Sequence, residues 1–133
     1  MNSIETLKIL TEELPPIPTL SSFETNIEKG YSEYVVEEGL SFGHSLYNRP
    51  EVAVMRMFVS KGTKWPNHVH DNETEWLMVY KGSIKVRCDN EEDVTLVPGS
   101  AIEFCKNKNH YGEALEDTWL IAVSIPRVDG YPK

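Results

Sequence analysis

Short apolar runs alternate with tight polar breaks along residues 34–125. The runs are rich in β-branched and aromatic residues, and the breaks contain Gly, Pro, Asn and Asp, a pattern typical of strands joined by turns. Closely spaced strands without intervening helices predict an all-β fold, an antiparallel sandwich or barrel. The predicted strands cover nine segments: residues 34–36, 41–46, 52–59, 75–80, 84–88, 94–97, 101–104, 110–114 and 118–125.

The N-terminal part of the chain has a helical pattern instead. Apolar residues recur there at spacings of three and four, which predicts one stripe of a helix over residues 3–14: Ile4, Leu7, Leu10 and Leu14. The proline-rich segment 15–18 ends that helix, because proline lacks the N–H that a helix needs. A capping box that starts at Ser21 and the glycine Gly30 delimit a second short helix. We therefore divide the chain into a helical N-terminal extension, residues 1–33, and a barrel domain, residues 34–133.

Composition and charge restrict the class of protein further. With 133 residues, 40% of them apolar and 26% charged, the chain has the size and balance of one folded domain. Its net charge of −8 disfavours binding to nucleic acid. We also find no apolar run near the ~20 residues that span a bilayer and no secretory signal pattern. We therefore expect a cytoplasmic protein without a nucleic-acid or membrane partner, in which Cys88 and Cys105 are reduced thiols.

The most distinctive chemistry belongs to the pair His68 and His70. Alternate residues of a strand point to the same face, so the two imidazoles are expected side by side, and a tight turn would bring Glu75 against them. Two histidines and one carboxylate form the ligand set of many iron sites. A third imidazole, His110, opens a later predicted strand, whereas His44 is interpreted as an ordinary surface or hydrogen-bonded histidine.

Together with two glycines, these residues resemble a family motif. The first cupin motif, G-x5-H-x-H-x4-E-x6-G, is matched at every specified position by Gly62, His68, His70, Glu75 and Gly82. The second cupin motif is matched more loosely, by Pro98-Gly99 and by His110 at the place of its last metal histidine. The resemblance covers residues 35–126 and leaves the predicted N-terminal helices outside it.

The resemblance implies both a fold and a metal centre. The fold would be a cupin double-stranded β-helix, a jelly-roll barrel of six to eight strands, with one or two short N-terminal helices. His68, His70, Glu75 and His110 would converge inside it on one divalent ion, either Fe, Mn, Ni or Zn. Because a small barrel encloses one pocket at its mouth, the expected partner is a small-molecule ligand or substrate.

Several functions are compatible with such a site. Four protein ligands on an ion that prefers six leave two positions for water, dioxygen or a chelating substrate. The first hypothesis is an enzyme for a small oxygen-bearing molecule, a dioxygenase-like oxidoreductase first and an isomerase or decarboxylase second. The second is a metal-dependent binding or sensing protein without turnover, and the third a structural protein. No catalytic acid or base stands out, since packing explains Tyr47, Tyr111 and Cys105 as well as a pocket does.

The strand that carries Glu75 also predicts an assembly. If Glu75 faces the barrel interior, Trp76, Met78 and Tyr80 point outward. Three large side chains in a row would form an exposed apolar patch on a monomer, which a partner should cover. We therefore expect a homodimer that uses this strand, with the helix of residues 3–14 packed across it.

Overall fold

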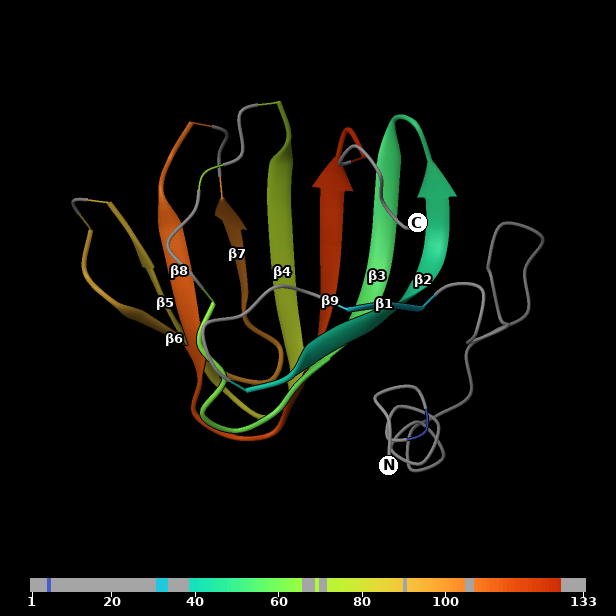
Figure 1. Ribbon diagram of the computed structural model, residues 1–133. Helices are drawn as coiled ribbons and strands as arrows, with labels where there is room; N and C mark the ends of the chain where they lie inside the picture. The colour runs from blue at the N-terminus through green and yellow to red at the C-terminus, as the bar shows by residue number, and fades with distance from the viewer. Residues whose placement is uncertain are drawn as a thin grey trace.

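The computed structural model describes residues 5, 31–33, 39–65, 69, 72–89, 91–104 and 107–127. These residues form nine strands in two antiparallel sheets (Figure 1), which confirms the predicted all-β class. The strands are β1 (Tyr31–Glu33), β2 (Ser41–Arg49), β3 (Val52–Val59), β4 (Thr74–Lys81), β5 (Ile84–Cys88), β6 (Val94–Leu96), β7 (Ala101–Phe104), β8 (His110–Ala114) and β9 (Thr118–Ile125).

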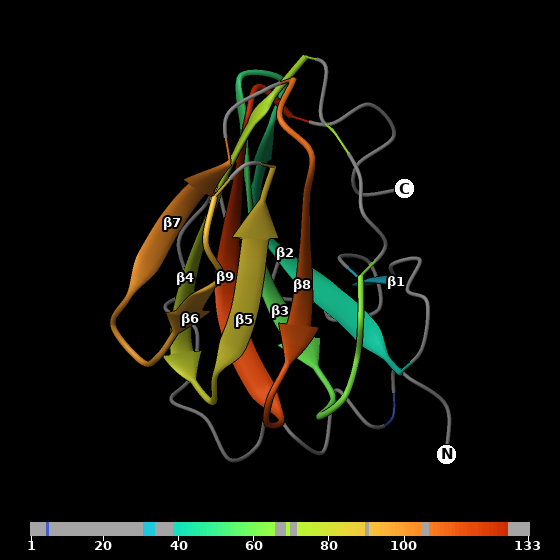
Figure 2. The ribbon, with the colours of Figure 1, turned by 90° about the vertical axis from the view of Figure 1, so that its left-hand side faces the viewer.

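The two sheets lie face to face. The large sheet has the order β1-β2-β3-β9-β4-β7, and the small sheet has the order β6-β5-β8. Figure 2 shows the small sheet in front of the large one, so that the two form a double layer. In the large sheet the last strand, β9, is inserted between β3 and β4, which joins distant parts of the sequence.

Most predicted strand bounds are confirmed, and the differences have a local cause. β2 continues to Arg49, beyond the predicted end at residue 46, because a bulge between Ser45 and Tyr47 keeps its polar end paired with β3. β4 is longer by one residue at each end, and β6 is shorter by one. β1 is not among the predicted strands and pairs with the edge of β2.

The predictions for the N-terminal part largely concern residues outside the described ranges. This holds for the strand expected over residues 34–36 and for both expected helices, apart from Glu5, which has helical conformation. The division at residue 33 therefore stays a prediction. Among the described residues, no helix is long and apolar enough to span a membrane.

The apolar core fills the space between the sheets. Alternate residues of each strand point into it, as the period of two requires. On β3, for example, Met55 and Met57 face the small sheet and lie in register with Ala122 and Leu120 of β9. The buried cluster comprises Met55, Met57, Val59, Leu77, Val79, Ile84, Val86, Cys88, Leu96, Phe104, Ala114 and Leu120.

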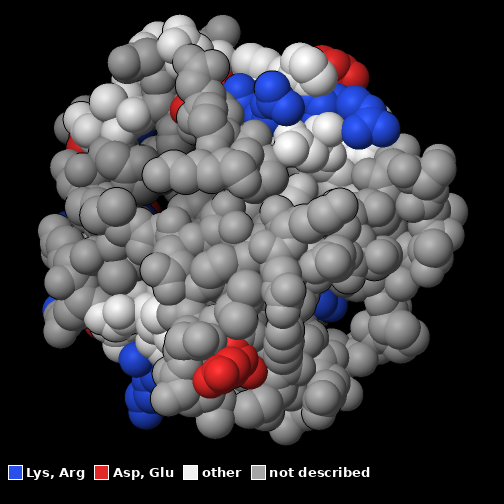
Figure 3. Space-filling view, turned by 45° about the vertical axis from the view of Figure 1, so that its right-hand side comes forward, with Lys and Arg blue, Asp and Glu red and all other residues white. Residues whose placement is uncertain are grey.

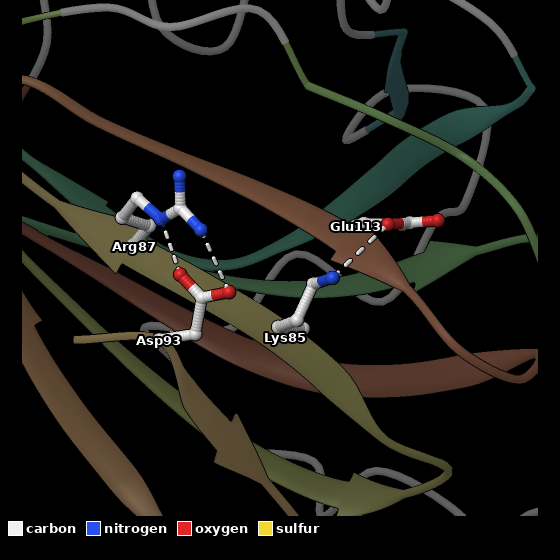
Figure 4. A network of polar contacts seen from close by, with 4 residues as sticks. All are labelled: Lys85, Arg87, Asp93 and Glu113. Atoms are coloured by element: carbon white, nitrogen blue, oxygen red, sulfur yellow. Dashed lines mark hydrogen bonds and ion pairs between the residues drawn. The ribbon is translucent and has the colours of Figure 1, made fainter.

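The outer face of the small sheet is charged. Lys85 Nζ lies 3.7 Å from Glu113 Oε1 across the β5–β8 pair, and Arg87 donates two hydrogen bonds to the Asp93 carboxylate (Figure 4). The guanidinium holds the pKa of Asp93 below its usual value. Such exposed pairs contribute little stability. They do, however, keep this face of the molecule hydrated.

The end of the described chain returns to the β2–β3 hairpin. The backbone N–H of Arg127 donates to the Pro50 carbonyl at 3.1 Å, and its guanidinium donates to Asn48 Oδ1 at 3.0 Å. Figure 3 shows basic side chains gathered along the upper edge of this side of the molecule. The two hydrogen bonds of Arg127 connect the end of β9 to the turn between β2 and β3.

Candidate functional site

Glu75 points into the space between the sheets. It lies on β4, in register with Ser124 of β9 and Phe104 of β7. Leu77 and Val79 share its face of the strand, and both belong to the buried core. The Glu75 side chain itself is 24% exposed, so its carboxylate lies at the edge of that core. The inward direction predicted from the alternation along this strand is confirmed.

His110 reaches the same space from the small sheet. It opens β8, lies in register with Cys88 of β5, and its side chain is only 3% exposed. Its Nδ1 lies 3.1 Å from the Lys108 carbonyl oxygen. Because a carbonyl oxygen only accepts hydrogen bonds, Nδ1 is the donor here, and in a neutral ring Nε2 would then present its lone pair to Glu75. This is the tautomer that a metal-binding histidine needs.

The two side chains meet between the sheets. His110 Nε2 lies 4.0 Å from Glu75 Oε1, which is too long for a hydrogen bond. Two donor atoms about 2.1 Å from one ion are about 3.0 Å apart when they are adjacent and about 4.2 Å apart when they are opposite. The observed separation therefore fits two ligands of one divalent ion, and the donor set of imidazole nitrogen and carboxylate oxygen suits such an ion.

Phe104 positions both members of the pair. It neighbours Glu75 across the β4–β7 ladder, and its ring stacks on that of His110 with centroids 4.1 Å apart and planes 7° from parallel. The stacked ring limits rotation of the imidazole. Sequence reasoning missed this role, although the alternation of Phe104 with the charged Glu103 in the predicted strand is consistent with an inward phenyl ring.

The other two predicted ligands, His68 and His70, lie outside the described residues. The chain on either side of them is described. Before them, the N–H of Trp65 donates to the carbonyl of Gly112 at 3.0 Å, and Gly112 follows His110 by two residues on β8. After them, β4 begins at Thr74, one residue before Glu75. Both flanks of the histidine segment therefore lie beside the described pair.

Other chemically active residues do not join the pair. Tyr111 lies on the outer face of β8, where the Arg87 guanidinium is 5.5 Å from its ring centre. The backbone of His44 lies in register with Arg56 of β3. Cys88 is a free, buried thiol whose pKa is raised by burial. Cys105 is outside the described ranges. Within those ranges, no three His, Cys, Asp or Glu side chains gather as a metal-binding group.

Comparison with known proteins identifies the family. The model of the cupin domain, Cupin_2, matches residues 55–126, which is more than half of the chain. The chain therefore belongs to the cupin family. Among curated proteins, no sequence matches this one.

Several solved structures have the same fold. KdgF from a Halomonas species superposes with a TM-score of 0.69 and 26% identity, covering 81% of this chain and 97% of that chain. An RmlC-like cupin from Shewanella frigidimarina gives 0.68 and 16%, covering 83% and 95%. A predicted oxalate decarboxylase from Thermotoga maritima gives 0.61 and 21%, covering 68% and 84%. At their low identity, the last two show the fold alone.

Proposed function

We propose that this cupin binds one divalent metal ion through His68, His70, Glu75 and His110 and acts on a small molecule that chelates the ion through oxygen. The buried approach of His110 Nε2 to Glu75 Oε1, at 4.0 Å, carries the proposal. The contact of His110 Nδ1 with the Lys108 carbonyl and the flanks of the undescribed histidine segment support it. The ion, either Fe, Mn, Ni or Zn, would supply Lewis acidity or, as iron, redox chemistry with dioxygen.

The chain's own residues orient the ligands and exclude water. The Lys108 carbonyl holds the proton on Nδ1 of His110, and the Phe104 ring holds the imidazole plane. Phe104 also belongs to the apolar core, so one side of the site is dry. A low dielectric strengthens the attraction between a bound ion and an oxygen ligand. The substrate class that suits this site is a small, partly apolar molecule with two oxygen donors.

The reaction that we propose first is a dioxygenase-like oxidation, ahead of isomerisation or decarboxylation. The alternative is metal-dependent binding or sensing without turnover, because the same ligands and the same apolar wall would serve both functions. A cytoplasmic location is part of this proposal, in agreement with the acidic composition of the chain.

Metal content tests the site directly. We expect Glu75→Gln, a substitution that preserves side-chain size, to weaken metal binding at least about tenfold, because an amide oxygen is a poorer ligand than a carboxylate. His68→Ala is expected to do the same. The measurement is elemental analysis of protein purified without a metal-binding tag. Glu113→Gln is the matched control, since Glu113 lies on the outer face of β8 and pairs with Lys85. Full stoichiometry in Glu75→Gln would exclude the site.

The outer face of β4 supports a homodimer. Trp76 is 37% exposed and shares its face with Met78 and Tyr80, which are half-buried. By contrast, the outer face of the small sheet carries the charged pairs of Figure 4. An apolar face on one sheet and a hydrated face on the other favour self-association through the large sheet. We therefore propose a dimer interface centred on Trp76.

A single charge should disrupt that interface. We expect light scattering to show a dimer for the unchanged protein at tens of micromolar and a monomer for Trp76→Glu, because the partner would have to bury an unpaired carboxylate. Val94→Glu is the control, since Val94 is an exposed apolar residue of the small sheet, at 45% exposure. An unchanged protein that is monomeric at this concentration would disprove the dimer.

A further inference from the structure

A buried arginine lies on the face of the large sheet opposite the metal site. Arg56 alternates along β3 with Met55 and Met57, which point into the core, and it lies in register with Ile121 of β9. It therefore belongs to the outer face of the sheet. Its side chain is nevertheless buried, with only 8% of the residue exposed. Arginine is almost never buried to this extent without a partner for its charge.

An aromatic ring, itself packed against a second one, lies beside this guanidinium. Its central carbon lies 5.5 Å from the ring centre of Trp119 on β9, within the range of a cation–π contact. Phe58, the next outward residue of β3, packs against the same indole with ring centres 5.2 Å apart. Both aromatic residues are buried. The rings hold the guanidinium in place, but they carry no negative charge.

The guanidinium has no negatively charged partner among the described residues. Arg56 Nε has no hydrogen-bond partner, and the group that acts on the pKa of Arg56 is the phenol of Tyr80 rather than a carboxylate. The two side chains are close enough to interact: burial raises the pKa of Tyr80 to about 12, while the charge of Arg56 opposes that rise. The phenol is therefore neutral and available as a donor. A buried guanidinium without a carboxylate partner incurs a cost that a bound oxyanion would remove.

We propose that Arg56 and Tyr80 form a second ligand site, which binds a small organic carboxylate on the outer face of the large sheet. The guanidinium donates to the carboxylate, as arginine does in charge-assisted pairs, and the phenol supplies a further donor. Ile121 of β9, which is half-buried and in register with Arg56, offers an apolar surface for the body of the ligand. A carboxylate attached to a flat apolar group matches these three elements, and the site lies on the face of the large sheet opposite the one from which Glu75 projects.

Thermal unfolding with sodium benzoate tests this site. At a hundredfold excess over Kd, we expect benzoate to raise the Tm of the unchanged protein by about 5–10 °C. Benzamide, its neutral counterpart, and sodium chloride at equal ionic strength should have no such effect. Acetate and inorganic phosphate should act more weakly than benzoate, because they lack the apolar group. Equal responses to all three anions would overturn the preference for an apolar carboxylate.

Two substitutions separate a ligand site from a purely structural arginine. Arg56→Met should be at least as stable as the unchanged protein without benzoate, since an unpaired buried charge is removed, and should lose the response to benzoate. Tyr80→Phe should fold and respond more weakly. Arg87→Met, at an arginine already paired with Asp93, should respond like the unchanged protein.

Three results would overturn the proposal. The first is a Tm of the unchanged protein that does not rise with benzoate up to about 10 mM, which is tenfold above a weak Kd of about 1 mM. The second is an equal response in Arg56→Met. The third is a lower Tm of Arg56→Met without benzoate, which would show that a carboxylate of the chain or of a second copy already pairs with this arginine.

Discussion

Iron-loaded protein is expected to consume dioxygen when it is given a chelating substrate, and the His110→Ala variant is expected to consume none. His110 supplies a buried Nε2 that faces the Glu75 carboxylate at 4.0 Å. Loss of one of the four proposed ligands would expose the ion and weaken its hold on a substrate. An oxygen electrode measures the rate with a panel of diketones, catechols and 2-hydroxy acids.

The controls for this prediction separate enzyme, binder and free-iron chemistry. Glu113→Gln should retain the full rate, because its carboxylate lies on the outer face of β8. Uptake that persists in His110→Ala would come from free iron and would contradict the enzyme proposal. Metal-dependent thermal stabilisation by one of these ligands without any product would instead support the binding protein, since a ligand that favours the folded state stabilises it by mass action.

Alanine at Gly82 is expected to destabilise the fold by more than about 3 kcal/mol, through backbone strain and a steric clash together. Gly82 has a φ of 93°, in the region that side chains disfavour. A Cβ there would lie 2.4 Å from the Asp117 carbonyl oxygen and 2.8 Å from Thr118 Cα. Both obstacles are backbone atoms, one just before β9 and one in its first residue, so neither can rotate away. The neighbouring Ser83 N–H also donates to Thr118 Oγ1 at 3.1 Å, which fixes the two turns together.

The other glycine of the motif is the matched control. Gly62 has a φ of 84°, but a Cβ at this position meets nothing within 4 Å. Gly62→Ala should therefore cost only the backbone strain, about 1–2 kcal/mol. Urea unfolding gives the free energy of unfolding of each variant. The two values can be compared if the free energy falls with urea concentration at the same slope in both variants. Equal destabilisation of the two variants would mean that the clash at Gly82 relaxes and that the close packing of the two turns is not needed.

The candidate site was partly accessible to sequence reasoning. The alternation of Glu75 with Leu77 and Val79 predicts an inward carboxylate, and the structure agrees. His110, in contrast, was linked to that carboxylate only through the resemblance to cupins. Thirty-five positions separate the two residues, and local periodicity carries no information about which distant strands face each other.

Local chemistry along the chain determined where the strands of this protein begin and end, because alternation, β-branched residues and turn residues act over a few positions. This holds for β3, β5, β7, β8 and β9, whose bounds match the predicted ones. Only the tertiary structure decided that β9 enters between β3 and β4, that Phe104 stacks on His110, and that Arg56 is buried. Those outcomes depend on which strands pair and which sheet faces pack, and such contacts form between residues far apart in the chain.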